Sequence, residues 1–188
     1  MTEPDYTRGV RSWVPVPGST KALLVQEALT AFGARGYDAV GVSELAASAG
    51  VTIGSLYHHF GSKAGLYDVV RTDVERRTLD RMEGAAAMRG VGGPAGIAAV
   101  LLVGYDFLVA AGFARLLAEQ RPAEAGAADP LADFFADTAD LGPAPLGSLL
   151  LAGWRRALAE SSARTAVGED AAPVRAALFA LLGGVTPA

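Results

Sequence analysis

Apolar residues recur at helical spacing over most of the chain. Between residues 19 and 35 they return every three or four positions, which predicts an amphipathic helix. Ser19 or Thr20 is placed to cap its start, and Gly36 is placed to end it in the left-handed conformation. Residues 1–18 contain three prolines and no such period. We therefore expect them to form an irregular arm.

The next segment alternates short helical patterns with glycine punctuation. Residues 42–49 and 53–60 each predict a short helix, and Gly50 between them permits a tight turn. Thr52 is placed to cap the second of these helices. A longer helix is expected over residues 63–87. Two short helices joined by a glycine turn have the layout of a helix-turn-helix.

The remainder of the chain also has a helical period. The glycine-rich segment 88–94 predicts a loop, and residues 94–120 predict one long helix or two that join at Gly112. Further helices are expected over residues 131–141, 146–162 and 170–182. The fold class is therefore all-α, with an arm at 1–18, a three-helix domain at 19–65 and a larger helical domain at 66–188.

Composition agrees with a helical globular protein. Of the 188 residues, 51% are hydrophobic and 19% are charged, so a sizeable core is expected. The absence of cysteine excludes disulfides and zinc–thiolate sites. The most apolar stretch, residues 97–109, is too short to span a bilayer, and the N-terminus lacks an apolar signal core. These features predict a soluble, cytoplasmic protein with no membrane partner.

The helix expected at 53–60 has a distinct outward face. Leu56 and Phe60 are four residues apart, so both are expected to point toward the core. His58 then points most directly away from it. The residues that flank this outward face are Ser55 and Tyr57. Small and hydrogen-bonding side chains on an exposed helix face are what contact with the edges of DNA bases requires.

Two neighbouring positions bear on the same interpretation. Lys63 follows the next turn, at a helix N-terminus, where its charge and the free backbone N–H groups could hold a phosphate. His59 lies closer to the core side, so it is either a phosphate ligand or a structural histidine inside the domain. His58 and His59 are adjacent and cannot chelate one metal as an i, i+4 pair can. No metal site is expected.

The segments that carry a family resemblance are those around these helices. Residues 21–32, 36–37, 44–46, 49–60 and 62–63 together resemble the DNA-binding region of TetR-family repressors. The run from 50 to 63 is the most specific part, and the resemblance covers roughly the first third of the chain. It implies a transcriptional regulator that binds double-stranded DNA through a helix-turn-helix.

The resemblance also implies a role for individual residues. Those expected to contact bases in the major groove are Ile53, Gly54, Ser55, Tyr57 and His58. Those expected to hold phosphates are Ser43, Thr52, Tyr57, His59 and Lys63. The chain departs from the family at Lys21, where arginine is usual, and at Val40 and Gly41, where hydroxyl side chains are frequent.

The charge distribution leaves a second interpretation open. The net charge is −4, and residues 1–80 hold 8 Lys+Arg against 9 Asp+Glu, which is unusual for a protein that binds phosphates. Only the charges on the contact face decide the matter, however. The alternative is a helical ligand-binding or scaffolding protein with weak or lost DNA binding. An enzyme is not expected, because both histidines are accounted for and no catalytic cluster or cofactor motif is present.

For the C-terminal domain, the resemblance implies a pocket for a small-molecule effector and a dimer interface. Candidate pocket residues are Tyr105, Asp106, Phe107, Phe113, Phe134 and Trp154. Asp106 lies within the most apolar helix, where a buried carboxylate needs a partner such as a ligand, Arg115 or a helix end.

The last two helices are expected to pair with those of a second subunit in a four-helix bundle. Candidate interface residues are Leu150, Trp154, Leu158, Val174, Leu178 and Leu181. A homodimer of this kind would bind a palindromic operator. An apolar small molecule is expected to release it from the DNA.

Overall fold

The computed structural model describes residues 18–89, 93–122, 129–138 and 146–183. Every regular element among these residues is an α-helix. In chain order the helices are α1 (Thr20–Arg35), α2 (Val42–Ser48), α3 (Ile53–Phe60), α4 (Lys63–Arg89), α5 (Gly93–Ala110), α6 (Ala114–Ala118), α7 (Pro130–Thr138), α8 (Leu146–Ala166) and α9 (Ala172–Gly183). In this part of the chain no helix is long and apolar enough to cross a membrane. The prediction of an all-α fold is confirmed.

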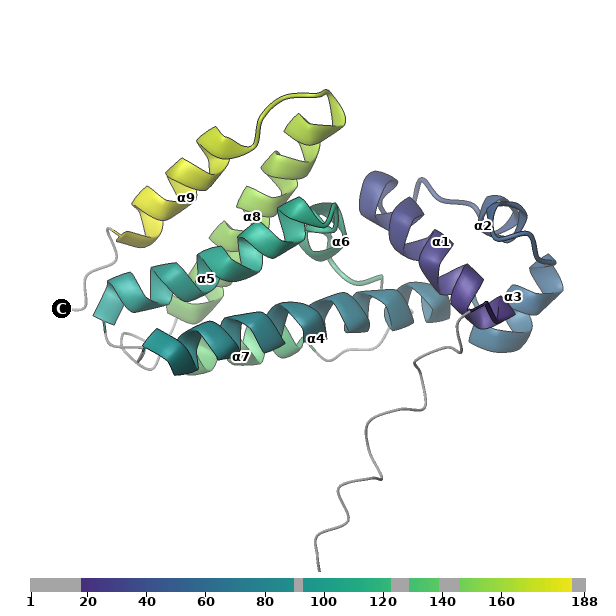
Figure 1. Cartoon of the computed structure of the whole chain (residues 1–188), viewed down its shortest axis with the longest axis horizontal. Coiled ribbons are helices and arrows are strands. Elements are labelled where there is room, and N and C mark those ends of the chain that lie inside the picture. The colour runs from purple at the N-terminus through teal and green to yellow at the C-terminus, as the bar shows by residue number, and fades with distance from the viewer. Residues whose placement is uncertain (1–17, 90–92, 123–128, 139–145, 184–188) are drawn as a thin grey trace, which may run out of the picture.

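The helices divide into two groups that share α4. Helices α1, α2 and α3 cluster at one end of the molecule, and α4 extends from them beneath the other helices (Figure 1). Helix α5 packs along α4, while α8 contacts α6 and α7, and α9 packs on α5 and α8. Helix α4 is therefore the element that physically connects the N-terminal cluster to the C-terminal helices.

Helix α1 is bounded by local signals that the sequence carries. The Ser19 hydroxyl accepts a hydrogen bond from the N–H of Ala22, at 3.2 Å, as an N-cap should. Gly36 ends the helix with φ +79°, but its ψ of 176° is extended and not left-handed helical as expected. Between these ends, Leu24 and Phe32 are fully buried, and the Phe32 ring lies 5.1 Å from that of Tyr67 on α4.

The C-terminal helices differ from the predicted ones mainly at their ends. The helical region expected over residues 94–120 is interrupted at Gly112, which has φ +74°. After this turn, α6 contains only five residues and ends at Ala118, two residues before the expected end. Helix α8 continues four residues beyond the expected end, to Ala166, and α9 begins two residues late, at Ala172. The arm expected at 1–18 lies outside the described residues except for Gly18.

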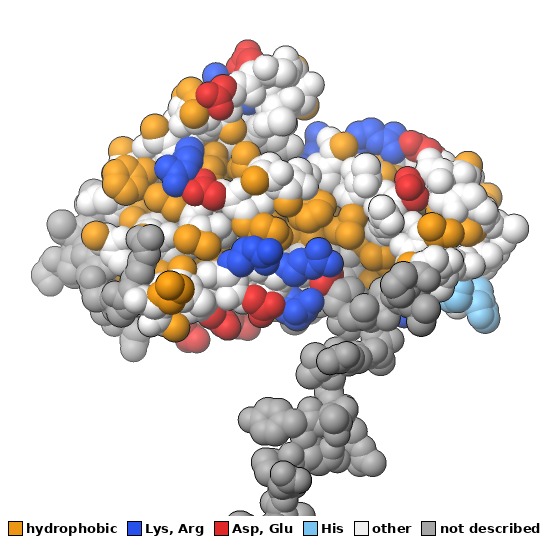
Figure 2. All heavy atoms as spheres, viewed as in Figure 1, with side chains coloured by type: hydrophobic (Ala, Val, Ile, Leu, Met, Phe, Trp, Pro, Cys, Tyr) orange, Lys and Arg blue, Asp and Glu red, His pale blue; other side chains and the backbone are white. Residues whose placement is uncertain are grey.

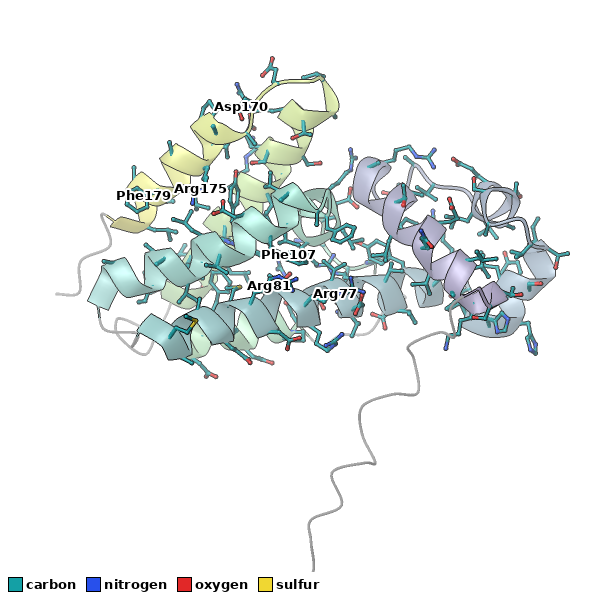
Figure 3. All side chains as sticks on the ribbon, viewed as in Figure 1. Arg77, Arg81, Phe107, Asp170, Arg175 and Phe179 are labelled. Carbon is teal, nitrogen blue, oxygen red and sulfur yellow. The ribbon has the colours of Figure 1, made fainter. Side chains whose placement is uncertain are left out.

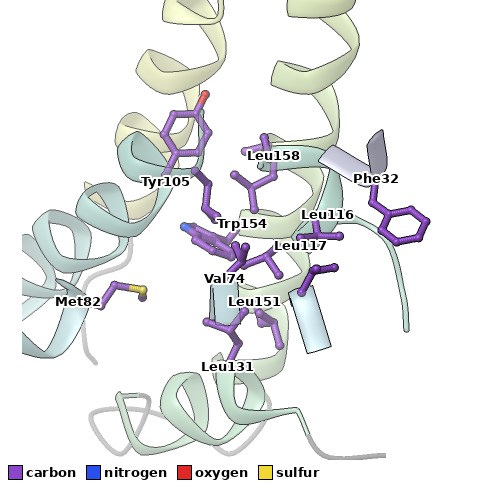
Figure 4. Close-up of a cluster of buried hydrophobic side chains, with 14 of the residues drawn as sticks. Phe32, Val74, Met82, Tyr105, Leu116, Leu117, Leu131, Leu151, Trp154 and Leu158 are labelled. Atoms are coloured by element: carbon purple, nitrogen blue, oxygen red, sulfur yellow. The ribbon is translucent and has the colours of Figure 1, made fainter. Parts of the chain in front are cut away.

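The core of the C-terminal group is organised around one tryptophan. Trp154 of α8 is fully buried, and its indole N–H donates a hydrogen bond to the Leu101 carbonyl of α5, at 3.0 Å. The Phe135 ring of α7 lies 5.6 Å away. Figure 4 shows this cluster, with side chains from several helices around the indole. The indole therefore joins α5, α7 and α8 and satisfies its only polar group inside the core.

A second buried cluster, on α4, is polar. The Arg71 guanidinium is almost fully buried and donates hydrogen bonds to the Glu75 carboxylate and to the carbonyls of Leu116 and Glu119 at the end of α6. Arg121 also pairs with Glu75. Because buried charges need partners, these contacts fix the end of α6 against the middle of α4.

Candidate nucleic-acid interface

The turn between α2 and α3 is formed by residues suited to it. Gly50 adopts φ +67°, a value that side chains with a Cβ rarely adopt, so the glycine is required here. Thr52 then caps α3, since its hydroxyl accepts the N–H of Ser55 at 3.1 Å and lies 2.9 Å from the Ser55 hydroxyl. Helix α3 starts and ends where the sequence predicted, at Ile53 and Phe60.

Helix α3 is anchored from one side and open on the other. Leu56 is fully buried among the core residues of the N-terminal cluster. Ile53 and Tyr57 are 42% and 50% exposed, and both histidines are exposed. In Figure 2 the histidine side chains protrude from the end of the molecule that α1–α3 form. A helix face that exposes large apolar and hydrogen-bonding side chains is suited to enter the major groove of DNA.

The position of His59 removes one of the two alternatives for this residue. Its side chain is exposed, with its ring centroid 5.2 Å from His58 and 6.1 Å from Phe60. A structural histidine inside the domain is therefore excluded. His58 points outward, as the helical wheel predicted.

Lys63 lies at the start of α4, next to α3. Its ammonium nitrogen is 4.2 Å from the ring centroid of Tyr37, which is a cation–π contact. Beside it, the Ser62 hydroxyl accepts the N–H of Gly65 at 2.9 Å and caps the helix. The ring contact holds the positive charge at the N-terminus of α4, where the helix dipole also favours an anion.

The N-terminus of α2 has an incomplete cap. Gly41 is the N-cap residue and makes no side-chain hydrogen bond, while Ser43 beside it is exposed. The hydrogen bond from Arg35 to the Glu44 carboxylate, aided by the Arg35 charge and by the Gly41 N–H, holds the pKa of Glu44 below its usual value. Glu44 thus supplies one half of a capping box, and Arg35 balances its charge.

The segment around α3 contains no acidic residue although the chain as a whole is acidic. Residues 45–67 contain no Asp or Glu, and Lys63 is the charged side chain among them. The acidic Glu44 is paired with Arg35. Along residues 45–67 an approaching phosphate would therefore meet one lysine, two histidines and backbone N–H groups and no carboxylate.

These features match a known family of regulators. Residues 24–70, which run from α1 into α4, match the family model described as bacterial regulatory proteins, tetR family. The N-terminal domain belongs to the TetR family. This TetR-family domain contains α2, the glycine turn and α3 as its helix-turn-helix. The family is regulatory and not enzymatic.

A curated relative agrees over the same region. A stretch of 57 residues is 46% identical to the HTH-type transcriptional repressor KstR2 of Mycolicibacterium smegmatis. The match spans 30% of this chain and only 28% of that repressor. The similarity therefore concerns the TetR-family DNA-binding domain.

Solved structures extend the likeness of fold to most of the chain. The fatty acid degradation regulator FadR from Bacillus halodurans superposes with a TM-score of 0.63 at 14% identity, over 87% of this chain and 97% of that one. A TetR-family transcriptional regulator from Pectobacterium atrosepticum gives 0.56 at 24% identity, over 86% and 89%. The C-terminal helices thus also have a TetR-like arrangement.

Among the C-terminal helices, the predicted pocket residues lie in different surroundings. Trp154 is a core residue, and Tyr105 is buried with its hydroxyl 2.6 Å from that of Ser161. Burial raises the pKa of Tyr105. Phe107 and Phe113 form a ring pair of their own, and Phe134 lies partly buried beside Phe135.

The expectation for Asp106 is wrong. Its carboxylate is 44% exposed and forms a two-pronged ion pair with Arg175 of α9, at 2.6 and 2.7 Å. Arg115, one of the expected partners, pairs with Glu119 instead. Figure 3 shows Arg175 on α9, on the side of the molecule where Phe107 and Arg81 also lie. The Arg81 guanidinium covers the Phe107 ring at 3.8 Å.

Several of the predicted dimer residues are also used inside the protomer. Trp154 and Leu158 are fully buried, and Leu150 and Leu178 are nearly so, which leaves their side chains no surface to offer a second copy. Their assignment to the interface is therefore corrected. Val174 is partly buried, whereas Leu181 is 59% exposed on α9.

Leu149 of α8 and Phe179 of α9 are exposed large apolar residues of these two helices, and sequence reasoning missed Phe179. It also missed the Arg71 cluster. An arginine and a glutamate four residues apart on the face that carries Tyr67 and Met82 were a usable signal for it.

Proposed function

We propose that this protein is a transcriptional regulator that binds DNA sequence-specifically through the exposed face of α3. The observation that supports this most is the combination of a fully buried Leu56 with exposed Ile53, Tyr57 and His58 on one short capped helix. A rigid helix with such a face can insert into the major groove and contact base edges.

In this proposal the residues act in two groups. Base edges are contacted by Ile53, Gly54, Ser55, Tyr57 and His58, and phosphates by Ser43, Thr52, Tyr57, His59 and Lys63. The Thr52 hydroxyl accepts the N–H of Ser55 that caps α3, so its proton or its backbone N–H is left to donate to a phosphate. Lys63, held over Tyr37, contributes the principal positive charge.

We further propose that two copies pair through α8 and α9. Large apolar side chains remain exposed on these helices: Leu149, Phe179 and Leu181. Contiguous apolar surface on a helix pair is suited to a helical dimer interface. A two-fold dimer would place two copies of α3 on successive turns of a palindromic operator.

Leu181→Glu should dissociate such a dimer at micromolar concentration, because it introduces a charge into the apolar contact. Analytical ultracentrifugation measures the change. Met88→Glu is the matched control, since Met88 is 89% exposed on α4, and should leave the dimer intact. A wild-type protein that sediments as a monomer would contradict this part of the proposal. Trp154→Glu and Leu178→Glu cannot test the dimer, because both side chains are buried in the core of the protomer and their replacement would unfold it.

Regulation by a small apolar effector completes the proposal. Helix α4 begins beside α3 and continues along α5, so a shift of its position would change the spacing of the two α3 helices in a dimer. An effector releases the DNA only if it binds more tightly to the dimer arrangement in which the spacing of the two α3 helices does not match the operator.

Selection from random double-stranded DNA tests the DNA-binding role. The wild-type protein should enrich a two-fold symmetric sequence. The double variant Tyr57→Ala with His58→Ala should lose this enrichment and retain its helical circular dichroism, because both side chains are exposed. Met88→Ala, at an exposed position of α4, should enrich the same sequence as the wild type. If the wild-type protein enriches nothing, the DNA-binding proposal is wrong and the alternative of a ligand-binding or scaffolding protein is favoured.

A further inference from the structure

A hollow of about 250 Å³ lies at the contact between the DNA-binding domain and the C-terminal helices. One wall is formed by Gly33 and Ala34 of α1, and another by Gly112 in the turn between α5 and α6. The third wall is the end of α8, with Ser162 and Thr165. None of the aromatic residues predicted for a pocket lines it. The hollow is thus a separate feature, shared by both domains.

Backbone contacts keep this hollow open. A Cβ atom added to Gly33 would lie only 2.7 Å from the Gly112 carbonyl oxygen, so α1 and the turn already touch backbone to backbone. They cannot approach further to close the gap. The residues around the gap are glycine, alanine, serine, threonine and one valine, whose side chains are too short to fill it. The space therefore follows from the small residues in the sequence and from the direct contact beside them.

A polar contact holds the same two domains together near the hollow. The Glu119 carboxylate accepts the N–H of Tyr37, just after α1, at 3.1 Å, and the Nε–H of Arg115 at 2.9 Å. One end of α6 is thereby attached to the DNA-binding domain. A molecule in the hollow would lie against a joint that is fixed by both the glycine contact and this carboxylate.

The chemistry of the lining selects the kind of molecule that fits. Among the described residues, no charged side chain lines the hollow. Ser161 donates to the Ala157 carbonyl and Thr165 to the Ser161 carbonyl, both at 2.8 Å, so these two hydroxyl protons are used. Ser162 is half-buried and its hydroxyl has no hydrogen bond to any other described residue. It can serve one oxygen of a bound molecule.

Size narrows the choice further. A dry protein cavity of about 150 Å³ accommodates benzene, so the hollow has room for roughly ten non-hydrogen atoms. This corresponds to one ring with a short substituent, or to a short acyl chain.

We propose that this hollow binds a small, uncharged, largely apolar molecule with one hydroxyl or carbonyl oxygen, and that this molecule bridges α1 and α8. The proposal gives a location to the effector of the proposed regulator and rests on that function for its consequence. A molecule that touches both domains biases their relative arrangement whenever it binds one arrangement more tightly.

Benzyl alcohol is a suitable probe because it has one ring and one hydroxyl. In TROSY NMR spectra of the full chain, titration should produce saturable shifts at the amides of Gly112, Ala114, Ser162 and Thr165. Benzoate, of similar size but charged, should bind at least tenfold more weakly. No saturable shift with benzyl alcohol, or shifts centred on Trp154, would overturn the proposal.

Variants test the location independently. Ser162→Leu fills the hollow and should weaken benzyl alcohol binding at least tenfold. Ala34→Leu fills it from α1, where the side chain is exposed, and serves if the first variant does not fold. Ala136→Leu, an equal enlargement at an exposed position of α7, should bind as the wild type does. If a folded Ser162→Leu or Ala34→Leu variant binds benzyl alcohol as tightly as the wild type does, the hollow is not the binding site.

DNA binding by the same samples separates this inference from the proposed function. If the wild-type chain binds its selected DNA but shows no probe binding at the hollow, only the site is wrong. If it selects no DNA, the proposed function fails whatever the probe does. If the wild-type chain selects DNA and also binds benzyl alcohol at the hollow, a saturating concentration of benzyl alcohol should change its DNA affinity by at least fivefold. The DNA affinity of Ser162→Leu should not change.

Discussion

Replacement of Arg71 by methionine should destabilise the protein strongly, because it removes the centre of a buried polar cluster. The guanidinium is 1% exposed and bonds the Glu75 carboxylate at 2.9 Å, the Leu116 carbonyl at 3.0 Å and the Glu119 carbonyl at 2.6 Å. Methionine has a similar length and no donor. The variant would remove the Arg71 donor from the Glu119 carbonyl and from one side of the Glu75 carboxylate, while the Leu116 carbonyl keeps the Tyr67 hydroxyl at 3.3 Å.

The expected loss is about 3 kcal/mol of unfolding free energy. Removal of one member of a buried ion pair costs about 3–5 kcal/mol, because the other charge remains buried. The lower end applies because Arg121 still pairs with Glu75. Arg35→Met is the control, since Arg35 and Glu44 form a pair in which both side chains are nearly half exposed. It should cost far less than Arg71→Met, because solvent screens an exposed pair.

Urea unfolding at one fixed protein concentration measures both values, because the stability of a dimer depends on concentration. The double variant Arg71→Met with Glu75→Gln should lose at least about 1 kcal/mol less than the sum of the single losses, since the two side chains interact directly. Equal stability of Arg71→Met and Arg35→Met, or strict additivity in the double variant, would refute the reasoning.

Two further predictions concern the joint and the loop that precedes α7. Gly33→Ala should lower the unfolding temperature, because its Cβ would clash with the Gly112 carbonyl oxygen, while Gly84→Ala, which meets nothing within 4 Å in α4, should raise stability by about 0.5–1 kcal/mol. A stabilised Gly33→Ala would disprove the close contact. Burial alone would raise the pKa of Asp129, but the hydrogen bond and charge of Arg155 outweigh it and hold that pKa below its usual value. The carboxylate therefore stabilises the fold above its unfolded pKa of about 3.9, and this contribution is lost as pH falls through the lower folded value. Asp129→Asn should be less stable than the wild type at pH 7, with the difference vanishing near pH 2; a constant difference in urea unfolding across this range would count against the ion pair.

The DNA-binding domain was predictable because its signals are local. Thr52 caps α3 and Gly61 ends it, so both ends of the helix are encoded within a few residues of where they occur. Leu56 and His58 lie on opposite faces of the helix, which follows from helical geometry alone. For these positions, sequence and structure agree in detail.

The C-terminal errors arise from contacts between residues far apart in the chain. Asp106 was expected to be buried because its neighbours are apolar, but its partner Arg175 is 69 residues away, on α9. Trp154 was a candidate for both the pocket and the dimer interface, because the resemblance implies an aromatic pocket and the pairing of the last two helices with those of a second subunit. The packing of α5 and α7 against the indole determines which side of α8 faces inward. Helical periodicity contains no information about such packing.

The most direct test of the account is the affinity of the purified protein for its selected DNA, compared with a shuffled sequence of equal length, by fluorescence anisotropy over a salt series. At physiological salt, the selected sequence should bind at least about 1,000-fold more tightly. Lys63→Ala should weaken both complexes by the same factor and reduce the salt slope by about one ion. Equal affinity of the wild-type protein for selected and shuffled DNA would contradict the central claim that α3 recognises a DNA sequence.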